Sequence, residues 1–217
     1  MSEASILIPC RSATVVGDLS MPPGAGLLVI FAHGSGSSRA SPRNRRVAAR
    51  LHERGLATLL FDLLTEPEAS DRRNVFDIAL LARRLGEAIQ WARAQPGSAA
   101  VPYGLFGAST GAAAALLAAV EHAADVRAIV SRGGRPDLAA DALPRVTAPT
   151  LLIVGGDDTQ VLTLNRWAFE RLACVKRLAV VPRATHLFEE PGALEQVATL
   201  AADWFAEHLR PEEPADE

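Results

Sequence analysis

The sequence predicts one α/β domain with a mostly parallel, doubly wound sheet of about seven or eight strands and helices on both faces. Short apolar runs alternate with helical patterns along nearly the whole chain. From the third run onward these runs are continuously apolar, as expected for strands that are covered on both faces. Repeated alternation of strands and helices is typical of right-handed crossovers between parallel strands.

Eight runs are short, apolar and rich in β-branched residues, and we predict a strand for each. They cover residues 4–9, 13–20, 26–32, 57–62, 101–106, 126–131, 149–154 and 175–181. The runs from the third onward are mostly continuous apolar stretches rather than alternating ones.

Helices are predicted between these strands by amphipathic spacing and by residues that start or stop a helix. Ser41-Pro42 opens the first helix and Gly55 ends it, which places Pro early and Gly past the end. A longer helical stripe runs from Asn74 to Gln95 and ends before Pro96-Gly97. The remaining predicted helices cover residues 110–123, 136–143, 162–173 and 192–209.

The composition is that of an ordinary globular protein. The chain has 217 residues, of which 49% are hydrophobic and 22% charged, so we predict a single domain over residues 1–210. The acidic, proline-bearing tail at residues 211–217 is expected to be disordered. A formal net charge of −3 gives no overall attraction to nucleic acid or to a membrane surface.

The sequence also predicts a cytoplasmic location. The N-terminus has an acidic residue where a signal peptide would have basic ones, and the longest apolar run, 112–120, is too short to span a membrane. Cys10 and Cys174 are far apart and form no CxxC motif. We therefore expect two reduced thiols, and no metal or other cofactor.

A serine stands between two glycines where a predicted strand turns into a predicted helix. The motif is Gly107-Ala108-Ser109-Thr110-Gly111, a G-x-S-x-G pattern. A sharp strand-to-helix turn strains its apical residue and leaves no room for side chains two residues away. We therefore predict that Ser109 is a nucleophile held at the carboxyl edge of the sheet.

A serine nucleophile needs a base, and the base needs an acid to orient it. Among five histidines, His186 follows the strand at 175–181 in a loop at the carboxyl edge of the sheet, which makes it the predicted base. The strand at 149–154 ends in two aspartates, Asp157 and Asp158. Asp158 is favoured because it fits a G-x-x-D-x-x-V spacing, and Asp157 remains the alternative.

The third predicted strand ends in His33-Gly34-Ser35-Gly36, a flexible loop at the same edge of the sheet. We predict that the backbone N–H groups of Ser35 and Thr110 form the oxyanion hole. His33 is a competing candidate for the base, but its position favours a structural role in which it pins the loop. The loop does not match a phosphate-binding P-loop, because no lysine follows at the required spacing.

With these motifs in this order, the chain resembles the α/β-hydrolase superfamily and, within it, the dienelactone-hydrolase-like group of small hydrolases. The resemblance implies a serine hydrolase that cleaves carboxylic ester or thioester bonds of small substrates. Catalysis would use the triad Ser109, His186 and Asp158 and an acyl-enzyme, without a cofactor. True dienelactone hydrolases have a cysteine nucleophile, and the serine found here favours ordinary carboxylic esters.

Only residues 132–148 separate the strands at 126–131 and 149–154, so we predict no sizeable cap domain and an open site with little enclosed volume. Arg132 and Arg135, near the predicted nucleophile, and Arg39 and Arg43, after the oxyanion loop, are candidates to bind an acidic substrate group. The predicted partner is a small-molecule ester, and the chain is expected to be a monomer or a homodimer. A dienelactone-type lactone hydrolase and a catalytically silent binding protein remain alternatives.

Overall fold

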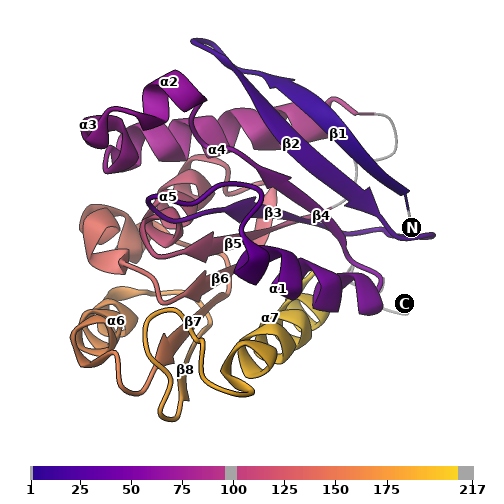
Figure 1. The fold of residues 1–217 in the computed structure, drawn as a ribbon. Coiled ribbons are helices and arrows are strands. Elements are labelled where there is room, and N and C mark those ends of the chain that lie inside the picture. The colour runs from indigo at the N-terminus through magenta and orange to yellow at the C-terminus, as the bar shows by residue number, and fades with distance from the viewer. Residues whose placement is uncertain (1, 96–101, 210–217) are drawn as a thin grey trace, which may run out of the picture.

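The computed structural model describes residues 2–95 and 102–209, which form one eight-stranded sheet flanked by helices (Figure 1). The strand order is β1-β2-β4-β3-β5-β6-β7-β8. β1 and β2 are antiparallel to each other, and β2 is antiparallel to β4. From β4 onward in this order, which includes β3, all neighbouring strands are parallel. The strands are β1 (Ser2–Pro9), β2 (Thr14–Met21), β3 (Leu28–Ala32), β4 (Ala57–Phe61), β5 (Tyr103–Ala108), β6 (Val126–Arg132), β7 (Thr150–Gly155) and β8 (Lys176–Val181).

Helices cover both faces of the sheet (Figure 1). α1 (Pro42–Glu53) packs against α7 (Ala193–His208) on one face, and α4 (Ile78–Arg93), α5 (Thr110–Glu121), the 3-10 helix η1 (Pro136–Arg145) and α6 (Thr159–Arg171) cover the other. This arrangement confirms the predicted fold class, and the described part of the chain contains no cap domain.

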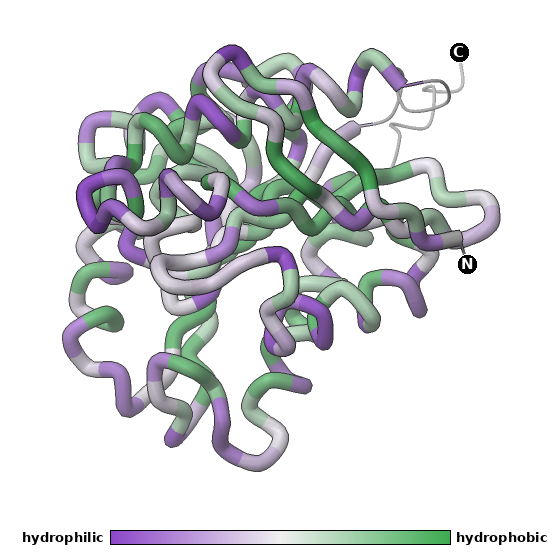
Figure 2. Tube along the Cα trace, turned by 45° about the horizontal axis from the view of Figure 1, so that its top comes forward, coloured by the Kyte–Doolittle hydropathy of each residue, from purple (hydrophilic) through white to green (hydrophobic). Residues whose placement is uncertain are grey.

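The core lies in two layers, one on each side of the sheet. Every residue of β3, β4, β5 and β7 is buried, which explains why these strands read as continuous apolar runs. In Figure 2 the hydrophobic residues follow the strands and the inner sides of the helices, whereas many peripheral turns are hydrophilic. β1 and β2 are less buried. The edge strand β8 is also mostly only partly buried, so the expectation that all strands from the third onward are covered on both faces is wrong for β8.

All eight predicted strands are present, but the predicted helix over residues 74–95 is not continuous. Asp77 caps α4 by accepting a hydrogen bond from Leu80 N–H, and the chain before it forms two short helices, α2 (Glu66–Ala69) and α3 (Arg72–Val75). The apolar spacing continued across these breaks, so the periodicity alone overestimated the length of the helix. The predicted stop at residues 96–97 and the predicted tail at 211–217 lie outside the described residues.

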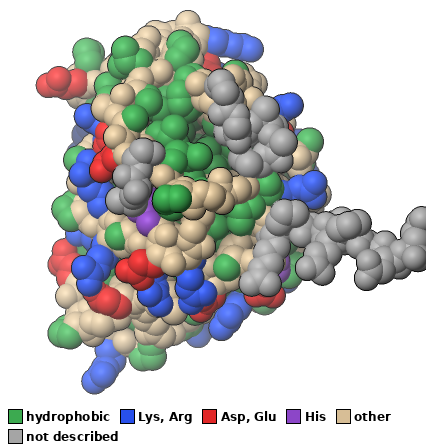
Figure 3. All heavy atoms as spheres, turned by 90° about the vertical axis from the view of Figure 1, so that its right-hand side faces the viewer, with side chains coloured by type: hydrophobic (Ala, Val, Ile, Leu, Met, Phe, Trp, Pro, Cys, Tyr) green, Lys and Arg blue, Asp and Glu red, His purple; other side chains and the backbone are tan. Residues whose placement is uncertain are grey.

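Charged side chains of both signs surround apolar ones on the face seen in Figure 3, as is usual for a surface that contacts water. Among the described residues, no helix is both long and apolar enough to cross a membrane.

Candidate active site

The turn from β5 to α5 holds Ser109 in a strained conformation. Its backbone has φ 52° and ψ −119°, a left-handed region that non-glycine residues rarely adopt. Both backbone polar groups of Ser109 are hydrogen-bonded. Its N–H donates to the Arg132 carbonyl at 3.1 Å, and its carbonyl accepts from Ala112 N–H and Arg135 N–H. Ser109 itself is only partly buried.

The two glycines of the motif are required by close contacts. A Cβ on Gly107 would lie 2.4 Å from Ala112 Cα, and a Cβ on Gly111 would lie 2.2 Å from the Ala32 carbonyl oxygen. Both distances are far below a van der Waals contact, and the atoms that a Cβ would meet are backbone. Gly107 therefore lets the start of α5 approach β5, whereas Gly111 lets α5 approach the end of β3. The sequence predicted small residues at both positions but attributed both to contact within one strand-to-helix turn.

His186 and Asp158 contact each other at the same edge of the sheet. His186 Nδ1 lies 2.7 Å from Asp158 Oδ2, whereas Asp157 is exposed. The loops that carry these residues are joined by backbone contacts, since Asp157 N–H donates to the Ala184 carbonyl at 3.0 Å. Of the two aspartates considered from the sequence, Asp158 is therefore the one that is hydrogen-bonded to His186.

The segment after β6 borders both the serine and the histidine. The Arg132 carbonyl accepts the hydrogen bond from Ser109 N–H, and a Cβ on the next residue, Gly133, would lie 3.5 Å from His186 Nδ1. Gly133 has φ +51° and donates its N–H to the Ile153 carbonyl. Ser109 and His186 thus lie next to consecutive residues of one turn.

The glycine-rich loop after β3 lies directly on the turn at Ser109. A Cβ on Gly34 would lie 3.0 Å from both the Ser109 Cβ and the Ala108 carbonyl oxygen. The Ser35 N–H, a predicted oxyanion donor, donates to Thr110 Oγ1 at 2.9 Å. The buried hydroxyl of Thr110 therefore links this loop to the start of α5, a contact that the sequence did not predict.

His33 is fully engaged in structural hydrogen bonds. Its Nε2 accepts from Leu63 N–H at 3.1 Å, so the ring proton resides on Nδ1, which donates to the Gly34 carbonyl at 3.0 Å. Burial lowers the pKa of His33 and outweighs the opposing effects of the Gly34 carbonyl and the Asp62 charge. A neutral ring with both nitrogens in use suits the role that the sequence suggested, a histidine that pins the loop.

A cavity of about 370 Å³ lies beside the glycine-rich loop. Its walls come from this loop, from the segment after β4 and from α2, α3 and α4, and its aliphatic lining consists of Leu63, Leu64, Ala69, Val75 and Leu81. The short connection between β6 and β7 had predicted an open site with little enclosed volume. The walls of the cavity are instead supplied by the connection between β4 and α4.

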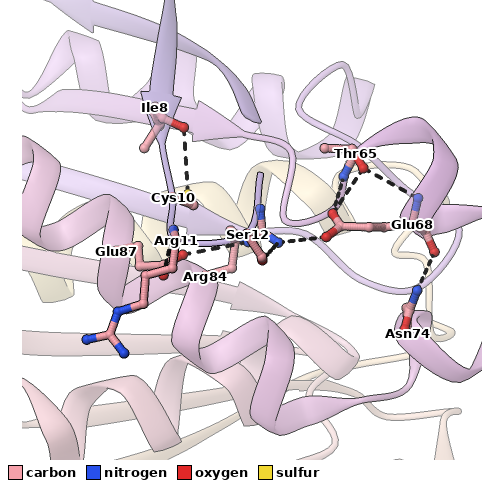
Figure 4. Close-up of polar contacts among 9 residues, drawn as sticks. All are labelled: Ile8, Cys10, Arg11, Ser12, Thr65, Glu68, Asn74, Arg84 and Glu87. Carbon is pink, nitrogen blue, oxygen red and sulfur yellow. Dashed lines mark hydrogen bonds and ion pairs between the residues drawn. The ribbon is translucent and has the colours of Figure 1, made fainter. Parts of the chain in front are cut away.

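A buried ion-pair network fixes this wall (Figure 4). Arg84 of α4 is only 1% exposed and binds Glu68 of α2 at 2.9 Å, and Glu68 also accepts hydrogen bonds from the backbone and side chain of Thr65. Burial raises the pKa of Glu68, but the hydrogen bonds from Thr65 and the Arg84 charge outweigh it, so the pKa lies below its usual value. The signal in the sequence was the capping-box pattern that begins at Thr65.

The candidate arginines differ in their partners. Arg39 is paired with Asp62 and Asp18, and Arg135 is paired with Asp137 at 2.7 Å. The charges of both are therefore already compensated, which removes the physical reason to assign either to an acidic substrate group. Arg132 is buried and has no ion pair among the described residues.

Fold and site together define an α/β-hydrolase. No family model matches the chain. A crystal structure from Anabaena variabilis, named a dienelactone hydrolase, is 54% identical and covers 96% of this chain and 99% of its own, with a TM-score of 0.94. The chain therefore belongs to the dienelactone hydrolase family. Est1E from Butyrivibrio proteoclasticus, 16% identical with a TM-score of 0.80, covers 94% of this chain and 98% of its own and shares the fold.

A longer protein from Mycobacterium tuberculosis is 60% identical over 209 residues, which are 96% of this chain and 47% of that protein. It carries the provisional name phosphoribosyl transferase. The chain thus spans about half the length of the curated relatives it matches.

Proposed function

We propose that the chain is a serine hydrolase that cleaves carboxylic ester or thioester bonds of small substrates. The observation that carries the proposal is the hydrogen bond of 2.7 Å between His186 and Asp158, at the edge where Ser109 has a φ of 52°. The membership in a family of hydrolases supports the same reaction class. Cys10 is a poor candidate for the nucleophile, because burial and Glu87 raise its pKa to about 11.

In the proposed reaction, Ser109 Oγ attacks the carbonyl carbon while His186 Nε2 takes the hydroxyl proton. Asp158 keeps the other ring proton on Nδ1 and stabilises the imidazolium that forms. The Thr110 N–H donates to the oxyanion, and the Ser35 N–H joins it by exchanging its acceptor in this structure, Thr110 Oγ1, for the oxyanion. His186 then protonates the leaving alkoxide or thiolate. A water molecule attacks the acyl-enzyme, again with His186 as base, and releases the acid and the free serine.

The cavity beside the glycine-rich loop is the proposed acyl pocket. Its volume of about 370 Å³ is near the lower end of the range of small-molecule sites, which is roughly 300–1,000 Å³. A short aliphatic acyl group would contact Leu63, Leu64 and Val75 there. We therefore propose small acyl groups rather than long chains.

A dienelactone-type lactone hydrolase is the second candidate, and it is favoured by the name of the 54% identical relative. The same triad would open a lactone ring, so the two candidates differ in substrate and not in mechanism. The name phosphoribosyl transferase belongs to longer proteins, of which this chain matches 47%. A cytoplasmic location and a monomer or homodimer remain predictions.

The test is the turnover of short p-nitrophenyl esters and thioesters by the wild type and by single variants. We expect Ser109→Ala and His186→Ala each to lower kcat by about 10⁶-fold. Ser5→Ala, at an exposed serine of β1 away from the site, is the matched control and should keep wild-type turnover. Equal turnover in Ser109→Ala and Ser5→Ala would exclude Ser109 as the nucleophile, and a folded wild type without turnover would favour a silent binding protein.

A further inference from the structure

Arg132, the last residue of β6, is a buried cation without a counter-ion. The residue is 7% exposed, and its Nε and Nη1 atoms have no hydrogen-bond partner among the described residues. Burial, with a smaller contribution from the Arg43 charge, lowers the pKa of Arg132 to about 10. The side chain therefore remains charged at neutral pH in a place where a charge is costly unless it is paired.

This situation is unusual among the buried or half-buried arginines of the chain. Arg84 is paired with Glu68, Arg39 with Asp62, and Arg135 with Asp137. Each of these side chains has the carboxylate of a described residue within ion-pair distance, and Arg132 has none among the described residues. Among the described residues, the charge of Arg132 is therefore uncompensated.

A second guanidinium approaches the same place. The Arg132 guanidinium carbon lies 5.9 Å from the centre of the Phe188 ring, and Arg43 at the start of α1 binds the next residue, Glu189, at 3.2 Å. The Glu189 side chain is 65% exposed, so its ion pair with Arg43 contributes little to stability. Another anion can therefore replace Glu189 as the partner of Arg43. Arg43 Nε is also buried without a hydrogen-bond partner among the described residues.

The two arginines border the candidate active site. The Arg132 carbonyl binds Ser109 N–H, and Phe188 follows His186 by two residues in the same loop. An anion held between Arg132 and Arg43 would therefore lie beside the loop that carries the proposed base.

We propose that Arg132 and Arg43 bind a phosphate group carried by the ester substrate, an inference that rests on the proposed hydrolase function. Three nitrogen atoms, Arg132 Nε, Arg132 Nη1 and Arg43 Nε, need acceptors. A phosphate monoester offers three terminal oxygens and nearly two negative charges at neutral pH, so it matches both the donors and the two cations. A carboxylate offers two oxygens and one charge.

The first test measures binding without catalysis. Inorganic phosphate is titrated by calorimetry into the wild type, Ser109→Ala, Arg132→Met and Arg46→Met. Arg46 is also on α1 but is 63% exposed and paired with Glu195, so Arg46→Met is the matched control. We expect equal phosphate affinity in the wild type, Ser109→Ala and Arg46→Met, and at least tenfold weaker binding in Arg132→Met. Thermal unfolding of Arg132→Met reports its folding, which replacing an unpaired buried charge with an apolar side chain should not impair.

The second test compares three esters that share one acyl group and differ in the alcohol, which is neutral, carboxylated or phosphorylated. The phosphorylated ester should have the highest kcat/KM, and its ratio to the neutral ester should fall at least tenfold in Arg132→Met and in Arg43→Met but not in Arg46→Met. A carboxylated ester that equals or exceeds the phosphorylated one would overturn the assignment, as would phosphate binding that Arg132→Met leaves unchanged. Failure of the proposed function looks different, because the neutral ester would then not be hydrolysed either.

Discussion

The hydroxyl of Thr110 offers a sharp test of how the oxyanion hole is held. It accepts the Ser35 N–H at 2.9 Å, and Thr110 is only 4% exposed. Thr110→Val keeps the shape of the side chain but removes this acceptor, so a partly buried N–H loses its partner. Such a loss costs roughly 1–3 kcal/mol, which corresponds to a decrease in Tm of about 2–12 °C for a chain of this size.

The effect on catalysis follows from the same contact. The Thr110 hydroxyl occupies the Ser35 N–H in this structure, so we expect it to act on catalysis by holding the loop beside the Ser109 turn until this N–H passes to the oxyanion. Thr110→Val releases the loop and thereby weakens one donor. The complete loss of one oxyanion donor lowers kcat by roughly 10²–10³-fold. Because the loop remains attached at Gly34, we expect a smaller decrease of about 10–100-fold, with little change in KM.

The assay is steady-state hydrolysis of p-nitrophenyl acetate by wild type, Thr110→Val and Thr110→Ser. Thr110→Ser retains the hydroxyl and should restore most of kcat, although it lacks the methyl group. A Thr110→Val enzyme with wild-type kcat and a lower Tm would show that the contact is only structural. The role of the Thr110 hydroxyl in positioning the Ser35 N–H for catalysis would then be refuted.

Three further predictions concern single side chains. Asp158→Asn should lower kcat by about 10⁴-fold, whereas Asp157→Asn, the exposed neighbour, should stay near the wild type; equal effects in steady-state assays would contradict the pairing. The lowered pKa of Glu68 means that its ionised form stabilises the fold above the unfolded-state pKa and that this contribution is lost as the pH falls through the folded-state value. In chemical unfolding between pH 7 and 3, the free energy of unfolding should therefore fall less steeply with decreasing pH in Glu68→Gln than in the wild type. Equal slopes in the two proteins would refute this. Because the pKa of Cys10 is raised to about 11, iodoacetamide at pH 8 should modify it far more slowly in the folded than in the unfolded protein, as followed by mass spectrometry; equal rates would contradict its burial.

The sequence predicted those features that local pattern determines. Continuous apolar runs identified the parallel strands, because burial on both faces removes the polar alternation. The glycines around Ser109 identified the sharp turn, because a Cβ at Gly111 would collide with the Ala32 carbonyl. The spacing after β7 favoured Asp158, the aspartate that binds His186.

The features that the sequence missed depend on contacts between distant segments. The Ser35–Thr110 hydrogen bond joins residues 75 positions apart, and no local pattern reports it. Arg39 and Arg132 look alike in the sequence, yet folding brings Asp62 to the former and buries the latter without a partner. Whether an arginine is free to bind an anion depends on which carboxylates the fold brings near it.

The most direct test of the central claim is to label the protein with a fluorophosphonate and to map the adduct by mass spectrometry of its peptides. We expect a single adduct on Ser109, which does not form when the protein is denatured before labelling and does not form in Ser109→Ala. The same adduct should form in Ser5→Ala, at an exposed serine of β1. A folded wild-type protein that gives no adduct, or an adduct on another residue, would contradict the assignment of Ser109 as the nucleophile.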